Sequence, residues 1–288
     1  MPDRPVDAEL DELIERALRE DVGSGDVTTE ATVEPGVRGH AEIVAKADGV
    51  IAGTAAARAV FQRLQPDVGW DSVEDGRRVR AGDTVASITG EARTLVTGER
   101  TALNLLGRMS GIATLTRAFV DAVAGTAARI VDTRKTSPGL RALEKAAVRA
   151  GGGENHRSGL YDMVLIKENH VALAGGIEAA VRAARRHAPK DMTLEIEVRD
   201  LDELDRALAA GVDRVLLDNM DLDTLRQAVG RARGMGDERP RLEASGNMTL
   251  ERVRAVAETG VDLISVGALT HSAPTLDLSM LIRTGPRG

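Results

Sequence analysis

The first third of the chain changes between helical and strand-like patterns of apolar residues. Apolar positions recur at helical spacing from about Asp7 to Glu20, which predicts an N-terminal helix. Residues 39–53 have the pattern of a strand and a turn, and residues 54–64 that of an alanine-rich helix. Residues 68–90 carry Gly, Asp and alternating Val positions, which predict a small β unit. Together these elements indicate an α/β domain.

A long helical pattern at about residues 93–123 follows this domain. Ser110 and Gly111 interrupt it, and we predict either two helices or one helix bent at this pair. The pair marks the predicted domain boundary. We therefore predict an N-terminal α/β sandwich domain at residues 1–110 and a second domain at residues 111–288. The tail of the second domain, about residues 273–288, could pack back on the first domain.

Beyond the boundary, short apolar strands alternate with helical stretches. The predicted strands are residues 128–134, 162–167, 193–198, 213–219, 241–245 and 262–268. This alternation predicts a parallel sheet, for which a closed α/β barrel is the simplest arrangement and an open doubly wound sheet the alternative. Runs such as MVLI and RVLL are continuously apolar, as in strands buried on both faces.

Composition excludes several classes of function. The net charge is −7, which argues against a nucleic-acid or membrane partner, because both need an excess of basic side chains. The chain has no cysteine, which excludes disulfides, thiolate nucleophiles and zinc-thiolate sites. Its N-terminus is charged throughout, and no stretch approaches the roughly 20 apolar residues of a membrane span. We therefore expect a cytoplasmic protein.

Polar residues follow the carboxyl ends of the predicted strands, which in a parallel barrel converge on one rim where active sites are built. They are Arg134-Lys135, Lys167-Glu168-Asn169-His170, Glu195 and Glu197, Asp218-Asn219, Glu243 with Ser245-Gly246, and Gly267 with Thr270-His271. Cations beside carboxylates predict a ligand with several negative charges, together with a site for a divalent metal or ribose hydroxyls.

Two glycine-containing segments fit an anion. Ser245 and Gly246 precede the helix predicted near Thr249, so backbone N–H groups and the helix dipole favour a phosphate there, and Gly267 could act likewise. The glycine triplet at residues 151–153 precedes His156 and Arg157 and suggests a mobile loop or close approach to a ligand. Three arginines could bind the carboxylates of a ligand, because the guanidinium group matches carboxylate geometry. They are Arg157, Arg134 and Arg100.

Several motifs resemble those of the quinolinate phosphoribosyltransferase family. They are GERTALNLLGRMSGIAT, VDTRKTSPGLR, EKAAVRAGGGENHRSGLYDMVLIKENH, EIEV, VLLDN, LEASGN and ISVGALTHS, preceded by the N-terminal signature EDVGSGDVTTEAT. The combination of DTRKT, NHR and LIKENH is highly specific. The resemblance implies an N-terminal α/β sandwich, a C-terminal α/β barrel of the type II phosphoribosyltransferase kind, and a homodimer or larger even oligomer.

The resemblance also implies roles for individual residues. Arg100 would reach the active site of the neighbouring subunit. The quinolinate carboxylates and diphosphate oxygens would be surrounded by Arg134, Lys135, His156, Arg157 and Lys167. Glu197 and Asp218 would address the ribose and its magnesium. The 5′-phosphate would be held by Ser245, Gly246, Gly267 and His271. The catalytic residues would be Lys135, Lys167, Glu197 and Asp218. Glu168 departs from the family, where Asp is more frequent, but keeps the charge.

The implied substrates are quinolinate and phosphoribosyl pyrophosphate, the latter with Mg²⁺. The pyridine nitrogen would attack the ribose, and the cationic ring so formed would accept the electrons released by loss of carbon dioxide. No organic cofactor is therefore expected.

Three alternatives remain at this point. Lys167 at a strand end could form a Schiff base, as in an aldolase-type barrel. Residues 68–90 resemble a lipoyl carrier domain, which suggests a non-catalytic binding module, but no lysine for cofactor attachment lies in their turn. A paralogue associated with molybdenum transport shares the fold and some of the motifs.

Overall fold

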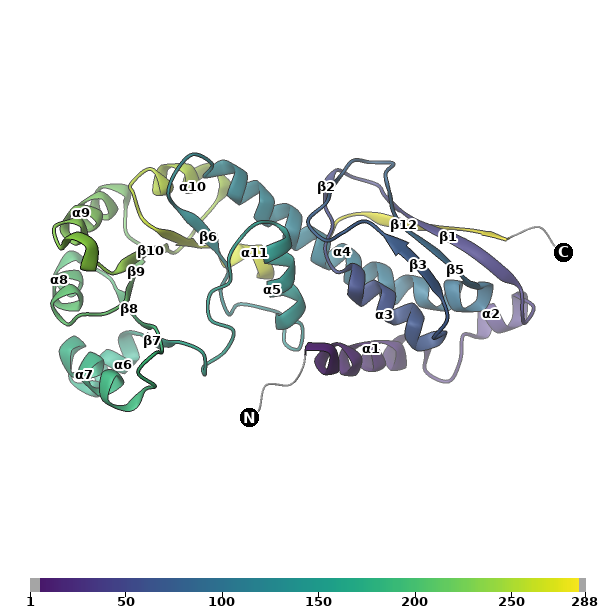
Figure 1. Ribbon diagram of the computed structural model, residues 1–288, viewed down its shortest axis with the longest axis horizontal. Helices are drawn as coiled ribbons and strands as arrows, with labels where there is room; N and C mark the ends of the chain where they lie inside the picture. The colour runs from purple at the N-terminus through teal and green to yellow at the C-terminus, as the bar shows by residue number, and fades with distance from the viewer. Residues whose placement is uncertain (1–5, 285–288) are drawn as a thin grey trace. The chain divides into compact units, whose positions relative to one another are not determined.

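The computed structural model describes residues 6–284, and these form two compact units (Figure 1). The first unit contains the residues up to 117, residues 137–152 and the residues from 273 onward. The second contains residues 118–136 and 153–272. The two units differ from the division predicted at residue 110, and three features of the chain explain the difference.

The first feature is the tail. Strand β12 (Leu278–Thr284) pairs antiparallel with β1 (Arg38–Ala45), in a register from Gly39 opposite Thr284 to Ala45 opposite Leu278. The last strand of the chain is therefore part of the first unit's sheet.

The second feature is helix α4 (Ala92–Ala122), which is one helix where two or a bent one were predicted. A Cβ atom on Gly111 would lie 2.0 Å from the carbonyl oxygen of Pro274, and one on Gly107 would lie 2.9 Å from that of Leu276. These glycines lie four positions apart, on one face of the helix. They give room to the returning tail, and they do not end the helix.

The third feature is helix α5 (Arg141–Ala150), which groups with the first unit although it was predicted as a barrel helix. The fully buried carboxylate of Glu144 accepts hydrogen bonds from Arg108 Nη2 at 3.0 Å and from the backbone N–H of Ser137 at 3.1 Å. These bonds tie α5 and the residues before it to α4.

The first unit is a four-stranded antiparallel sheet covered by helices. The strand order is β12-β1-β5-β3, and a separate two-stranded pair joins β2 to β4. The bounds not yet given are β2 Gly49–Val50, β3 Gly69–Ser72, β4 Arg78–Val79, β5 Thr84–Glu91, α1 Val6–Val22, α2 Val27–Thr32 and α3 Thr54–Leu64. Strand β1 buries alternate residues, and its Ile43 shares one core with Ile14 of α1, Phe61 of α3 and Leu95 of α4. The predicted sandwich domain is confirmed.

The second unit is a curved sheet of six parallel strands in the order β6-β11-β10-β9-β8-β7. Its strands are β6 Arg129–Val131, β7 Val164–Ile166, β8 Leu194–Val198, β9 Arg214–Asp218, β10 Arg241–Ser245 and β11 Leu263–Ser265. Figure 1 shows α7, α8, α9 and α10 outside the curve. The helical segments of this unit are α6 Glu168–Ala174, α7 Ile177–His187, α8 Leu201–Ala209, α9 Leu222–Arg233, the 3-10 turn Gly236–Glu238, α10 Leu250–Ala257 and α11 Ala268–His271.

This sheet confirms the predicted α/β barrel, with one difference. Within residues 6–284, no strand pairing joins β6 to β7, so the hydrogen-bonded circle is open at that point. An isolated parallel bridge between Val131 and Glu154 lies at the β6 side of the opening. The chain before β7 thus follows the edge of β6 without forming a strand of its own.

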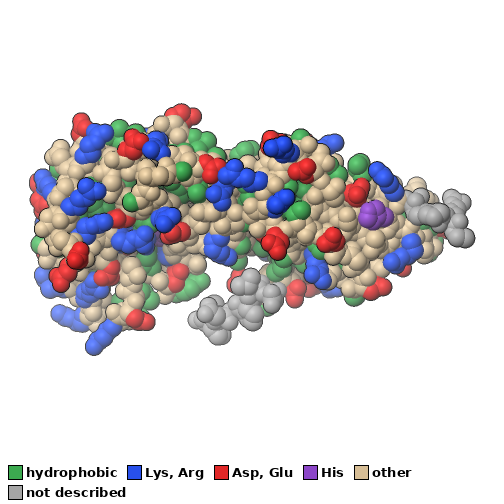
Figure 2. Space-filling view, turned by 45° about the horizontal axis from the view of Figure 1, so that its top comes forward, with side chains coloured by type: hydrophobic (Ala, Val, Ile, Leu, Met, Phe, Trp, Pro, Cys, Tyr) green, Lys and Arg blue, Asp and Glu red, His purple; other side chains and the backbone are tan. Residues whose placement is uncertain are grey.

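On the face that Figure 2 shows, basic and acidic side chains are interspersed. Between residues 6 and 284, no helix is both long and apolar enough to cross a membrane.

Candidate active site

A pocket of about 810 Å³ lies at the carboxyl ends of the barrel strands. Among its lining residues are nearly all of the site residues predicted from the sequence. These are Arg134, Lys135, His156, Arg157, Lys167, Glu197, Asp218, Ser245, Gly246, Gly267 and His271. The exception is Arg100, which is exposed on α4 in the first unit and is not among the lining residues.

The cationic part of the pocket contains two arginines, Arg134 and Arg157, whose charges lie close enough to repel each other. Burial lowers the pKa of Arg157, and the charge of neighbouring Arg134 lowers it further. The buried Nε of Arg134 has no hydrogen-bond partner within the described residues. Lys135 is exposed at the same wall. Guanidinium groups crowded in this way favour an anionic ligand, because a ligand carboxylate would supply the missing charge and hydrogen-bond acceptors.

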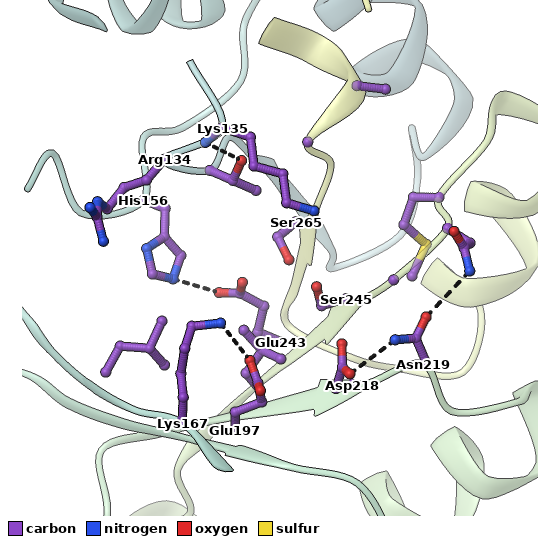
Figure 3. Close-up of a pocket in the computed structure, with 18 of the residues that line it drawn as sticks. Arg134, Lys135, His156, Lys167, Glu197, Asp218, Asn219, Glu243, Ser245 and Ser265 are labelled. Carbon is purple, nitrogen blue, oxygen red and sulfur yellow. Dashed lines mark hydrogen bonds and ion pairs between the residues drawn. The ribbon is translucent and has the colours of Figure 1, made fainter. Parts of the chain in front are cut away.

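A rim pair of carboxylates, Glu197 and Asp218, faces the pocket from β8 and β9 (Figure 3). Glu197 Oε2 accepts a hydrogen bond from Lys167 Nζ at 2.9 Å, and Asp218 Oδ2 accepts one from Asn219 Nδ2 at 2.9 Å. Each carboxylate thus keeps oxygen capacity for a ligand. Carboxylate oxygens are the protein ligands that Mg²⁺ prefers, which makes this pair suited to a substrate-bound magnesium ion.

A deep pair of carboxylates, Glu195 of β8 and Glu243 of β10, lies within the barrel and is fully buried. His156 Nε2 lies 2.9 Å from Glu195 Oε2 and 3.5 Å from Glu243 Oε2, and Arg214 Nη1 lies 3.3 Å from the latter oxygen. Burial raises the pKa of Glu195 to about 7. Burial, with the nearby charge of Glu195, also raises the pKa of Glu243 to about 7.

The deep group could also be considered for a metal ion, since ligand atoms of His156, Glu195 and Glu243 lie within 4.8 Å of one another. The guanidinium of Arg214 beside Glu243 already compensates negative charge at this place and would repel a cation. The rim pair, which has no arginine bound to it, suits a divalent cation better than this deep group does. The sequence analysis placed Glu195 and Glu243 at the rim. The structure places Glu195 deeper, outside the pocket lining, whereas Glu243 lines the pocket although its side chain is buried.

The part of the pocket that follows β9 and β10 is formed by tightly packed backbone. Gly246 has φ +97°, and a Cβ atom there would lie 2.1 Å from Oδ1 of Asn219. Asn219 and Asn247 have φ of 54° and 46°, a left-handed conformation that Asn tolerates better than most residues. Helix α10 begins shortly afterwards, at Leu250. The geometry leaves backbone N–H groups close to the pocket, as an anion site at a helix start requires.

Sequence reasoning named Asn219 among the strand-end residues without giving it a role. The signal was present in the dipeptide after β9, since an Asn directly after a strand often takes the left-handed conformation. Gly267 has a similar requirement for a small residue, because an added Cβ would lie 3.1 Å from Lys135 Cδ and 3.2 Å from His271 Nε2.

A barrel whose strand ends present cations, carboxylates and a glycine-containing loop to one pocket defines a class of proteins that bind a small polyanionic ligand. Comparison with known proteins narrows this class. Residues 26–110 match the N-terminal domain of quinolinate phosphoribosyl transferases, and residues 112–281 match the C-terminal domain. The chain belongs to the quinolinate phosphoribosyl transferase family.

Relatives of known sequence and structure agree. The chain is 47% identical over 281 residues to the nicotinate-nucleotide pyrophosphorylase [carboxylating] of Mycobacterium leprae, covering 95% of the chain and 98% of that protein. It is 45% identical over 276 residues to the probable enzyme of this name from Synechocystis sp., covering 95% and 92%. The solved structure of nicotinate-nucleotide pyrophosphorylase from Francisella tularensis superposes with a TM-score of 0.92 at 37% identity, covering 97% and 98%.

Proposed function

We propose that the chain is a quinolinate phosphoribosyltransferase, also called carboxylating nicotinate-nucleotide pyrophosphorylase, of de novo NAD biosynthesis. It joins quinolinate to phosphoribosyl pyrophosphate and releases pyrophosphate, carbon dioxide and nicotinate mononucleotide. The observation that carries this proposal is one pocket that combines two neighbouring arginines with a rim pair of carboxylates and a glycine-containing loop before a helix. The cytoplasm is the proposed location.

The pocket residues divide into two groups in this proposal. Quinolinate carboxylates and diphosphate oxygens are surrounded by Arg134, Lys135, His156, Arg157 and Lys167. His156 acts there through the backbone of Arg157, to which its imidazole is hydrogen-bonded. The ribose hydroxyls bind Glu197 and Asp218, and the 5′-phosphate binds Ser245, Gly246, Gly267 and His271. The protein contributes mainly by fixing charges in advance, because attack of the pyridine nitrogen on C1 requires alignment more than covalent help.

Mg²⁺ would complete the proposed site by supplying positive charge that favours departure of the pyrophosphate. Glu197 and Asp218 are the residues that would hold it, through substrate oxygens or directly. After the ring nitrogen has bonded to C1, the electron pair of the breaking bond to carbon dioxide stays on the ring carbon, where the adjacent positive nitrogen stabilises it. The ring carbon then takes up a proton. The substrate thus supplies its own electron sink, and no organic cofactor is proposed.

The Schiff-base alternative has no support from the pocket. Lys167 Nζ donates a hydrogen bond to Glu197 at 2.9 Å. This contact gives Lys167 an ion-pairing role at the pocket that needs no Schiff base. The arginines of the pocket would also have no role in aldol chemistry.

The test is a mixture of the protein with Mg²⁺, phosphoribosyl pyrophosphate and quinolinate. Release of carbon dioxide together with nicotinate mononucleotide is expected. Equal turnover of nicotinate in place of quinolinate would contradict the substrate assignment. No turnover of either would contradict the proposed function and would favour the molybdenum-associated paralogue instead.

The proposal includes a homodimer or larger even oligomer in which Arg100 completes the site of a neighbouring subunit. Arg100→Ala and Lys167→Ala should each be inactive alone. Mixed dimers should regain part of the activity, because one of their two sites would then contain both intact residues. Inactive mixed dimers, shown by mass spectrometry to have formed, would overturn this sharing.

A further inference from the structure

The segment Asn155–Arg157 carries two pocket residues but lies in no helix or strand. Its position must therefore come from side-chain contacts. Asp132, fully buried at the end of β6, makes two of them. Its Oδ1 accepts the backbone N–H of His156 at 2.8 Å, and its Oδ2 accepts Asn155 Nδ2 at 2.6 Å. The two oxygens of one buried carboxylate thus hold two successive residues of the segment.

The imidazole of His156 fixes the same segment from the other side. Its Nδ1 lies 2.8 Å from the backbone nitrogen of Arg157. A backbone N–H can only donate, so Nδ1 must carry a lone pair and no proton. In a neutral imidazole the proton is then on Nε2, which lies 2.9 Å from Oε2 of Glu195. A second proton on the ring would place two N–H groups face to face.

We infer that Asp132 and Glu195 are positioning residues that hold the segment 155–157 in place, with His156 neutral and protonated on Nε2. The hydrogen bonds form one chain from the deep carboxylate through the ring to the backbone of Arg157. They direct the guanidinium of Arg157, whose Nη1 also donates to the Met163 carbonyl at 3.4 Å, towards the pocket. The inference rests on the proposed function, since it assigns these residues to the quinolinate end of the site.

The cost of the arrangement supports a role in function. A carboxylate in the barrel interior is unfavourable unless it is hydrogen-bonded, and Oε1 of Glu195 has no partner within residues 6–284. An apolar residue at this position would remove that cost. A hydrophobic interior would, however, provide no acceptor for Nε2–H, and the ring could then rotate away from Arg157.

Wild-type protein gives the first test, which needs no substrate. Two-dimensional ¹⁵N–¹H correlation through the imidazole carbons reports the protonation state of each ring nitrogen, and the chain has only five histidines. His156 is assigned by loss of its signals in His156→Gln. A protonated Nε2 with an unprotonated Nδ1 is expected at pH 7. An imidazolium, or a proton on Nδ1, would overturn the inference while leaving the proposed function unaffected.

Substitution of Glu195 gives the second test. Glu195→Gln retains an oxygen acceptor of the same shape and should keep the KM for quinolinate within about 3-fold. Glu195→Leu removes the acceptor. The KM for quinolinate should then rise about 10-fold or more, because one buried hydrogen bond to a charged group corresponds to at least this change. The KM for phosphoribosyl pyrophosphate should stay within about 2-fold of the wild-type value. Equal rises in both KM values would indicate a merely structural role and overturn the inference. If the leucine variant does not fold, the tautomer measurement still decides.

Asp132→Asn and Asp262→Asn form a matched pair for the other contact. Asp262 Oδ2 also accepts a backbone N–H, that of Leu242 at 2.7 Å, but at the opposite ends of the strands. Loss of its charge should lower stability and leave both KM values unchanged. Asp132→Asn should raise the KM for quinolinate selectively. An equal KM for quinolinate in Asp132→Asn and Asp262→Asn would contradict positioning by Asp132.

Discussion

The deep pair Glu195 and Glu243 and the rim pair Glu197 and Asp218 use the same chemical group in opposite ways. Glu195 and Glu197 are two residues apart on β8 and point to the same side of the strand. Over these two residues the surroundings change, because Glu195 is fully buried and Glu197 faces the pocket. The deep carboxylates hold protein groups in place, whereas the rim carboxylates are available to a ligand. Depth along a barrel strand, and not residue type, separates the two roles.

The largest expected effect is on activity at the rim pair. Asp218→Asn keeps the shape but removes the charge that faces ribose and magnesium in our proposal. We expect kcat/KM to fall on the order of 10²-fold or more, as for other losses of a preorganised charge, with the melting temperature nearly unchanged. Steady-state kinetics and thermal unfolding measure the two quantities. Activity within 2-fold of wild type would remove the distinction between the pairs.

The deep pair should instead appear in the pH dependence of stability. In the folded protein the pKa of Glu243 is raised to about 7, so between its ordinary value near 4.5 and pH 7 the folded state binds more protons than the unfolded state. The free energy of unfolding therefore falls as the pH rises through this window and levels off above it. Glu243→Gln should reduce that fall by about 2 kcal/mol, measured by urea unfolding from pH 5 to 8. Asp218→Asn, as the control, should leave the slope as in wild type; identical slopes for all three proteins would refute the prediction.

A smaller effect is expected from the phosphate loop beside the rim pair. Gly246→Ala introduces a Cβ atom 2.1 Å from Asn219 Oδ1 at φ +97°. The loop must shift, and we expect about a 10-fold higher KM for phosphoribosyl pyrophosphate, because a strained backbone here misplaces the N–H groups. Gly211→Ala is the control, since φ is +71° but nothing lies within 4 Å of the added atom. If both variants raise this KM equally, close approach is not the cause.

The smallest effect is expected at Asn219 itself. Asn219→Ala places an alanine at φ 54° and should lower the free energy of unfolding by about 1 kcal/mol relative to Asn219→Gly, which has no Cβ in conflict. Urea unfolding measures the difference. Asn247, at φ 46°, should show the same order between its alanine and glycine variants. A more stable alanine variant at both positions would show that the left-handed backbone is not retained in solution.

Strand positions and the rim residues could be predicted because they depend on local pattern. The apolar runs before Lys167 and Asp218 are long enough to be recognised, and the barrel geometry then brings their ends together. The depth of Glu195 could not be predicted, because a period of two residues gives the face of a strand and not its distance from the rim. The partners of Glu195 depend on the register with β9 and on the course of the segment before β7.

The long helix shows the same limit for a backbone feature. The sequence around Gly111 reads as a weakness in a helix, and local propensity supports that reading. The reason for the glycine lies at Pro274, more than a hundred and fifty positions later, whose carbonyl needs the space. Such a contact becomes visible only when the tail is placed against α4.

The pairing of β12 with β1 has a consequence for how the protein is made. During synthesis every residue of the barrel leaves the ribosome before Leu278, so the second unit can fold while the first unit still lacks one edge of its sheet. Until then the backbone N–H and C=O groups on the β12 side of β1 stay available for pairing with another strand. The domain that begins the chain is therefore the one that is finished last.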